Sequence, residues 1–147
     1  MLVSDGWQHQ VRIYLPDELV ETARFHPESP ELGQLSHLLQ KHSATMKCQF
    51  DAFAEYVSEA EKEGVDKYPL YYWTKATIED PEKKQKHLRS FSLHVRGREV
   101  YSKDEADALE TDLQPLVGGV ITRISKHDSN PEHNPQMPER YRVIPKG

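Results

Sequence analysis

The sequence contains a single cysteine, Cys48, in 147 residues. One cysteine cannot form an intramolecular disulfide, which excludes the disulfide-rich scaffolds of small secreted proteins. No run of apolar residues approaches the roughly 18 residues that a membrane-spanning helix needs. The first ten residues, MLVSDGWQHQ, lack the basic and apolar regions of a secretory signal. These absences predict a cytoplasmic protein that does not enter a membrane.

The sequence also lacks the motifs that carry common chemistries. It contains no glycine-rich nucleotide loop, no complete set of metal ligands and no nucleophile motif. His127, Asp128 and His133 come nearest to a metal set, but their spacing matches no zinc pattern, and we interpret them as exposed loop residues. No local pattern places a base beside Cys48, so we interpret it as structural. We therefore predict no catalytic residue, no metal and no cofactor, and we favour a protein that is not an enzyme.

The composition is that of one small domain with a modest core. Hydrophobic residues make up 36% of the chain, charged residues make up 29%, and the net charge is -5. This mild negative charge argues against non-specific binding of a polyanion by the whole molecule. From His127 onward the chain is polar and rich in proline. We predict a single α+β domain over residues 1–126 and an extended polar tail over residues 127–147.

The first half of the chain predicts one strand and a long helical region. Residues 9–15 alternate between apolar and polar side chains, as in a half-buried strand, and the following proline ends that strand. A short helix is predicted over residues 16–25. Over residues 31–63 the apolar positions recur mostly at steps of three, four or seven, which predicts a long helix that Gly64 ends. Ser43 to Thr45 are weak helix formers, so we expect any bend or break there.

The second half predicts three further strands and one helix. Residues 70–78 alternate and predict a strand, residues 79–86 predict a polar loop, and residues 87–95 predict a second strand. A tight turn at Arg96–Gly97 is expected to lead into a short strand over residues 98–101. Ser102 and Glu105 form a capping box that opens a helix, and residues 120–125 predict the last strand.

This order of elements predicts an α+β fold. Strand, helices, strand, strand, helix and strand is the ferredoxin-like, or split βαβ, order, with an antiparallel four-stranded sheet and helices on one face. The helical region over residues 31–63 is then an extended insertion after the first strand. The alternative is a helical N-terminal half that packs on a separate four-strand meander.

The stretch YPLYYWTK at residues 68–75 contains four aromatic residues. If residues 70–78 form a central strand, the sheet face opposite the helices combines aromatic and cationic side chains. The predicted binding face consists of Arg12, Tyr14, Tyr71, Trp73, Lys75, His94, Arg96 and Arg123. Such side chains are enriched at protein–protein contacts, and the same mixture serves single-stranded nucleic-acid binding. A register slip of one residue would exchange the two faces of the sheet.

Three functions remain open on this reading. The first is a small protein-interaction module, such as a regulator, inhibitor or immunity-type binder, whose partner is another protein or a second copy in a homodimer. The second is single-stranded nucleic-acid binding through Tyr14, Tyr71, Trp73 and Arg96. The third is a small-ligand or enzymatic pocket between the sheet and the helices, with His94 and Tyr72 as its polar groups. A fold of this kind hosts all three classes, so the fold does not choose among them.

Overall fold

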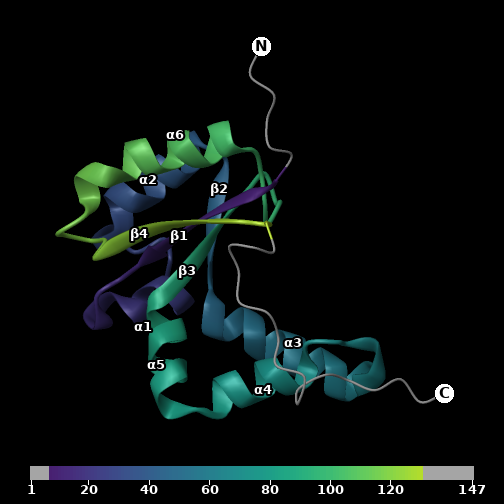
Figure 1. Ribbon diagram of the computed structural model, residues 1–147. Helices are drawn as coiled ribbons and strands as arrows, with labels where there is room; N and C mark the ends of the chain where they lie inside the picture. The colour runs from purple at the N-terminus through teal and green to yellow at the C-terminus, as the bar shows by residue number, and fades with distance from the viewer. Residues whose placement is uncertain (1–6, 131–147) are drawn as a thin grey trace.

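The computed structural model describes residues 7–130, and this part of the chain forms a four-stranded antiparallel sheet with six α-helices (Figure 1). The strands lie in the order β2-β3-β1-β4 and are β1 (His9–Tyr14), β2 (Ala44–Cys48), β3 (Ser90–Val95) and β4 (Arg123–Asp128). The helices are α1 (Asp17–Phe25), α2 (Gly33–Lys41), α3 (Gln49–Glu63), α4 (Tyr71–Glu79), α5 (Pro81–Arg89) and α6 (Lys103–Leu113). Short 3-10 turns cover Pro30–Leu32, Val65–Lys67 and Gln114–Leu116. The predicted α+β class and the four-stranded antiparallel sheet are confirmed.

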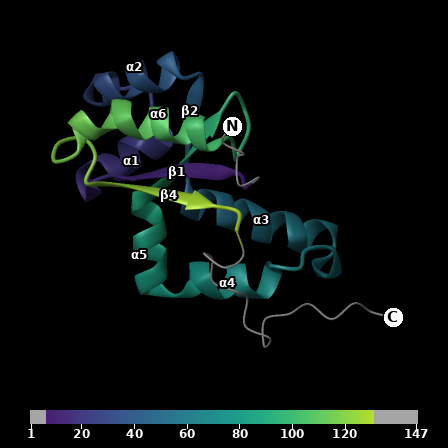
Figure 2. The ribbon, with the colours of Figure 1, turned by 45° about the horizontal axis from the view of Figure 1, so that its top comes forward.

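The main core lies on one face of the sheet. Val11 and Ile13 of β1 are fully buried, and the alternate residues of β3 point to the same side. Helices α1, α2 and α6 cover this face, and α2 and α6 lie side by side over it (Figures 1 and 2). The helical core residues are Ala23, Leu35, Leu39, Ala106, Leu109 and Leu113. The predicted half-buried strand at the start of the chain is therefore confirmed as β1.

Between β2 and β3 the chain makes a helical excursion, residues 49–89, which consists mainly of α3, α4 and α5. The excursion extends beyond one end of the sheet (Figure 1). It has a small core of its own, formed by Val57, Ala60 and Tyr71 and flanked by partly buried side chains. The structure therefore contains two hydrophobic clusters, one under the sheet and one within the excursion.

The turn after β3 and the cap of α6 follow the sequence signals. Arg96 and Gly97 both have positive φ, at 51° and 75°, as a type I′ turn requires. Val95 N donates to Arg98 O at 3.0 Å, and Arg98 N donates back to Val95 O at 2.9 Å. The capping box is confirmed, because Ser102 Oγ accepts a hydrogen bond from Glu105 N at 3.2 Å. Instead of the short strand predicted over residues 98–101, only single bridges occur, at Arg98 and Tyr101.

The prediction of one long helix over residues 31–63 is wrong. Helix α2 ends at Lys41, and β2 follows before the chain becomes helical again in α3. Ser43 takes a left-handed conformation with φ of 53°, and its carbonyl oxygen accepts a hydrogen bond from Arg96 N at 2.8 Å. This contact places the chain beside β3, so the residues expected to bend a helix instead begin an edge strand. The long insertion accordingly follows β2 and not β1.

The predicted strand over residues 70–78 and the predicted loop after it are also wrong, because both segments are helical. Helix α5 begins at a standard cap: Asp80 Oδ1 accepts hydrogen bonds from Glu82 N at 3.0 Å and from Lys83 N at 3.3 Å, and Pro81 occupies the first helical position.

The last strand begins three residues later than predicted and ends at Asp128, so the predicted domain boundary at residue 126 falls within β4. Residues 131–147 of the predicted tail lie outside the described residues.

Candidate functional site

The face of the sheet opposite the main core is polar. Directly paired residues on neighbouring strands point to the same side, so the register identifies the members of this face. Arg12 of β1 pairs with Ser92 of β3 and with Ser125 of β4. By the same pairing the face, which we call the Arg12 face, consists of Gln10, Arg12, Tyr14, Thr45, Lys47, Ser90, Ser92, His94, Arg123, Ser125 and His127. Gln49 and His87 of the excursion border it.

The guanidinium of Arg12 lies near the middle of this face and is half-buried. Its Nε donates to Gln10 Oε1 at 2.8 Å. The amide of Gln49 contacts it from α3: the oxygen accepts from Arg12 Nε at 3.1 Å and from Nη1 at 3.2 Å. We assign this orientation of the Gln49 amide because it also lets the amide nitrogen donate to Ser90 Oγ at 3.0 Å. Burial lowers the pKa of Arg12, but an arginine side chain stays charged in proteins.

Arg12 and Arg123 differ from the other arginines in the described part of the chain. The other four pair with carboxylates, in the contacts Arg24–Asp51, Arg89–Asp17, Arg96–Glu105 and Arg98–Glu105. Within residues 7–130, no carboxylate forms an ion pair with Arg12 or Arg123. The Arg123 guanidinium instead lies 4.1 Å from the centre of the Tyr14 ring. Among the arginines of residues 7–130, the two that form no ion pair with a carboxylate of these residues therefore lie on neighbouring strands of one face.

Two histidines at this face are held neutral. Desolvation, followed by the charges of Lys86, Arg12 and Lys83, lowers the pKa of His87 to about 4. Desolvation, Arg12, Arg123 and, to a smaller extent, Lys86 lower the pKa of His127 to about 4. The charge of Asp128 opposes this shift. Because Lys86 and Arg12 act on both imidazoles, the cations of β1 and α5 reach the same region. The Arg12 face is thus a positively charged and partly desolvated surface.

Ser125 and His127 lie as close together as a catalytic nucleophile and its base, but they share no other feature of such a pair. Ser125 Oγ lies 2.9 Å from His127 Nε2. A pKa of about 4 makes His127 a weak base, and no hydrogen bond from the described residues orients its other ring nitrogen. A catalytic base needs both features, so the pair does not form a catalytic dyad.

The eight residues predicted for the binding face are divided between separate places. Arg12, Tyr14, His94 and Arg123 lie on the Arg12 face, as their register requires. Tyr71, Trp73 and Lys75 lie on α4 in the excursion, because residues 71–79 form a helix. Tyr71 is only 5% exposed, and its hydroxyl donates to Glu61 at 2.9 Å. Arg96 lies in the turn after β3, paired with Glu105 at 2.8 Å.

The pair proposed for a pocket is also separated, because His94 is on β3 whereas Tyr72 lies on α4 and is 48% exposed. The sequence interpretation missed Gln10, Gln49, His87, Ser92, Ser125 and His127. Gln10 alternates with Arg12 along β1, so the period of that strand contained the signal. Gln49 and His87 come from segments whose secondary structure was assigned wrongly, and no local pattern places them at the sheet. His127 was interpreted as an exposed loop residue, but it is half-buried in β4.

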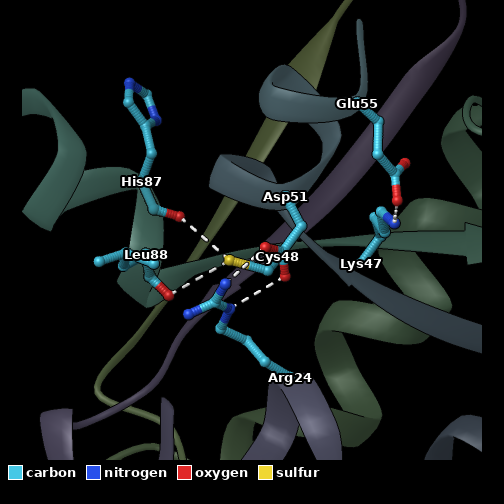
Figure 3. Close-up of polar contacts among 7 residues, drawn as sticks. All are labelled: Arg24, Lys47, Cys48, Asp51, Glu55, His87 and Leu88. Atoms are coloured by element: carbon cyan, nitrogen blue, oxygen red, sulfur yellow. Dashed lines mark hydrogen bonds and ion pairs between the residues drawn. The ribbon is translucent and has the colours of Figure 1, made fainter. Parts of the chain in front are cut away.

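The buried cysteine has a structural environment (Figure 3). Cys48 is 2% exposed, and its Sγ lies 3.5 Å from Leu88 O and 3.6 Å from His87 O. The imidazole of His87 points away from the sulfur, and the Arg24–Asp51 ion pair lies on the other side (Figure 3). Burial raises the pKa of this thiol, which favours the unreactive protonated form.

Two surface hollows are less suited to a charged ligand than the Arg12 face. One, of about 350 Å³, lies between the end of α2 and α6, and the other, of about 460 Å³, lies between α1 and α3. Their charged lining groups are mostly paired already, as in His42–Asp112 at 2.7 Å and Lys47–Glu55 at 2.6 Å. A charged ligand would have to break these pairs, whereas within residues 7–130 Arg12 and Arg123 have no ion pair to break.

Comparison with known proteins identifies no relative. No protein-family model matches the sequence, and searches of curated proteins and of solved structures find no significant similarity. Over residues 7–130 no helix has both the length and the apolar character needed to cross a bilayer. The same residues contain no group of three or more histidine, cysteine or carboxylate side chains placed to hold a metal ion.

Proposed function

We propose that this protein is a binding module, not an enzyme, and that its Arg12 face binds an acidic segment of a partner protein. The observation that carries the proposal is that no carboxylate of residues 7–130 forms an ion pair with Arg12 or Arg123, while each of the other arginines in this range has one. A partly desolvated cation is stabilised by a counter-charge, and a guanidinium prefers a carboxylate that it can bind through two hydrogen bonds. An acidic polypeptide supplies several such carboxylates along one chain.

A protein partner fits this face better than a single-stranded nucleic acid. Base stacking requires exposed aromatic rings, and Tyr71 and Trp73 lie on α4 instead of on the sheet. Tyr14 is the aromatic residue of the Arg12 face, and the guanidinium of Arg123 lies over its ring. The net charge of -5 further disfavours a polyanion as long as a nucleic acid.

We also infer that the topology is the ferredoxin-like order with a helical excursion inserted between β2 and β3. In support, β3 lies between β2 and β1, β1 lies between β3 and β4, and all neighbours are antiparallel. A cytoplasmic location remains our proposal and is supported by the single cysteine, which is buried as a free thiol.

The test of the proposed function is binding of a short fluorescent peptide of glutamate and serine, measured by anisotropy. The matched peptide has glutamine in place of glutamate. We expect the acidic peptide alone to bind, and Arg12→Ala and Arg123→Ala each to weaken it about tenfold or more, or about 1.4 kcal/mol. Lys103→Ala is the control, because this lysine lies on α6 and pairs with Asp107.

Four results would contradict the proposal. Equal binding of the two peptides would exclude recognition of carboxylates, and an unchanged affinity of Arg12→Ala would place the site elsewhere. Tighter binding of a single-stranded oligonucleotide with the same number of charges would favour the nucleic-acid function. A homodimer through this face would appear as a solution mass that is twice the chain mass in the wild type and is halved in Arg12→Glu.

A further inference from the structure

We infer that Gln49, held between His87, Ser90 and Arg12, is the positioning residue that presents Arg12 to the acidic segment. This inference rests on the proposed function and adds the residues that prepare the site. Gln49 is the first residue of α3 and is only 7% exposed, so its amide is confined beside the sheet. It thereby links the excursion to the Arg12 face.

The contacts of Gln49 form a chain from α5 to β1. The amide nitrogen lies 3.2 Å from His87 Nδ1 and 3.0 Å from Ser90 Oγ, and the amide oxygen accepts from Arg12 Nε and Nη1. All four distances are within hydrogen-bond range. Each polar atom of the amide is therefore used, as expected for a buried glutamine.

Arg12 and His87 contact opposite ends of this amide and together favour one orientation of it. An unprotonated Nδ1 can only accept a hydrogen bond, so it requires the NH₂ group of Gln49. The reversed amide would direct its NH₂ group at Arg12 Nε, where two donors would face each other. The low pKa of His87 leaves the ring uncharged near neutral pH, and an uncharged ring with its proton on Nε2 presents Nδ1 as an acceptor. The Arg12 donors therefore fix the Gln49 oxygen, and the Nε2–H tautomer of His87 completes the arrangement by accepting at Nδ1.

The effect on Arg12 is to leave one part of the guanidinium for a ligand. The amide oxygens of Gln10 and Gln49 both accept from Nε, and Gln49 also accepts from Nη1. Within the described residues, no hydrogen bond is made by Nη2. A guanidinium held in one orientation loses less conformational entropy when a ligand binds. We call the two amides of Gln10 and Gln49 that hold Arg12 the clamp. The clamp therefore prepares Arg12 for a carboxylate that approaches Nη2.

The experiment combines peptide affinity with the hydrogen exchange of the Arg12 Nε–H, observed by NMR. Gln49→Met keeps the length of the side chain and removes both amide groups. We expect it to weaken the acidic peptide about fivefold and to accelerate exchange of the Arg12 Nε–H. His87→Asn offers an oxygen close to the position of Nδ1 and should preserve both readouts, whereas His87→Phe should lose both. Gln85→Met, on the exposed side of α5, is the matched control.

A purely structural role would give a different result. Gln49→Met would then lower the melting temperature while the affinity and the exchange rate stayed at wild-type values, and this outcome overturns the inference. If Gln49→Met does not fold, equal behaviour of His87→Asn and His87→Phe overturns it instead. If the wild type binds no peptide, the proposed function is wrong and Gln49 presents nothing, while the exchange rate still shows whether the clamp exists.

Discussion

The hydroxyl of Tyr101 accepts a hydrogen bond from the backbone nitrogen of Val11 at 2.7 Å, inside the sheet. The same hydroxyl donates to Leu93 O at 2.9 Å. The regular pairing of β1 with β3 stops at Arg12 and Ser92, one residue before these groups. The backbone of Tyr101 pairs in turn with His9. A side chain therefore supplies the next link between β1 and β3.

Removal of this hydroxyl should destabilise the protein without creating a large cavity. Tyr101→Phe leaves a backbone N–H and a backbone C=O without partners in a fully buried position, which costs about 1–3 kcal/mol. Urea denaturation measures the loss. Tyr72→Phe is the control, because Tyr72 is 48% exposed and should change stability by less than about 0.5 kcal/mol. Equal stability of both variants would mean that β1 and β3 close the gap themselves.

The two neutral histidines predict how stability depends on pH. The pKa values of His87 and His127 fall from 6.5 to about 4 in the folded protein. Between these values the unfolded chain binds more protons than the folded one, so the free energy of unfolding decreases as pH falls from 6.5 to 4. Above pH 6.5 this contribution is fully present and constant. Both side chains are partly exposed, so we expect a loss of about 1–2 kcal/mol from each.

The measurement is urea denaturation between pH 7.5 and pH 4.5. The double variant His87→Asn/His127→Gln has no titrating imidazole at the Arg12 face, and its stability should vary less over this range. The lowered pKa of Asp107, about 2, affects stability only at lower pH, so it does not confuse the comparison. A wild-type profile as flat as that of the double variant would show that the histidines titrate normally.

The helices of the excursion show why sequence periodicity failed there. Tyr72, Thr74, Ala76 and Ile78 alternate with a second set that contains Lys75 and Thr77, and we interpreted this as the period of a strand. These residues are nevertheless helical, because the aromatic residues pack within the excursion, where Tyr71 joins Val57 and Ala60. The Asp-Pro-Glu sequence at residues 80–82 combines an N-cap side chain with a proline at the first helical position, which is a helix-start signal. That signal could have identified α5.

The face of the sheet was predictable in part. The alternation in β1 and β3 correctly separated inward from outward residues, which placed Arg12, Tyr14 and His94 on the outward face. Strand β2 was missed because Met46 and Phe50 continue the helical spacing of the segment before it. The contact of Gln49 with Arg12 depends on that missed strand, since β2 carries the chain to the sheet directly before α3. No local sequence pattern predicts a contact of this kind between distant segments.

The buried thiol should be unreactive in the folded protein. Burial raises the pKa of Cys48, and a 2% exposed sulfur is hardly accessible to a reagent. We expect Ellman's reagent at pH 8 to modify Cys48 only as fast as the protein unfolds, and to modify it rapidly in concentrated urea. A burst of modification in native buffer would show that β2 opens readily at the edge of the sheet.

The separate core of the excursion predicts that α4 can unfold while the sheet stays intact. Helix α4 has only nine residues, too few for stability without packing, and it packs mainly on α3 and α5. Its main buried side chain is Tyr71, so Tyr71→Ala removes most of what holds it. Such a truncation costs about 3–5 kcal/mol in a packed site. Amides of α4 should then exchange hydrogen much faster, while those of β1 and β3 keep their protection.

The result separates two ways in which the molecule can be organised. Tyr72→Ala is the control, because Tyr72 is its exposed neighbour on the same helix. If Tyr71→Ala accelerates exchange in β1 and β3 as much as in α4, the two hydrophobic clusters unfold as one unit. Local loss confined to α4 would instead mean that the excursion folds onto the sheet through α3 and α5. Gln49 and His87 belong to these two helices, so the Arg12 face would then keep its geometry in Tyr71→Ala.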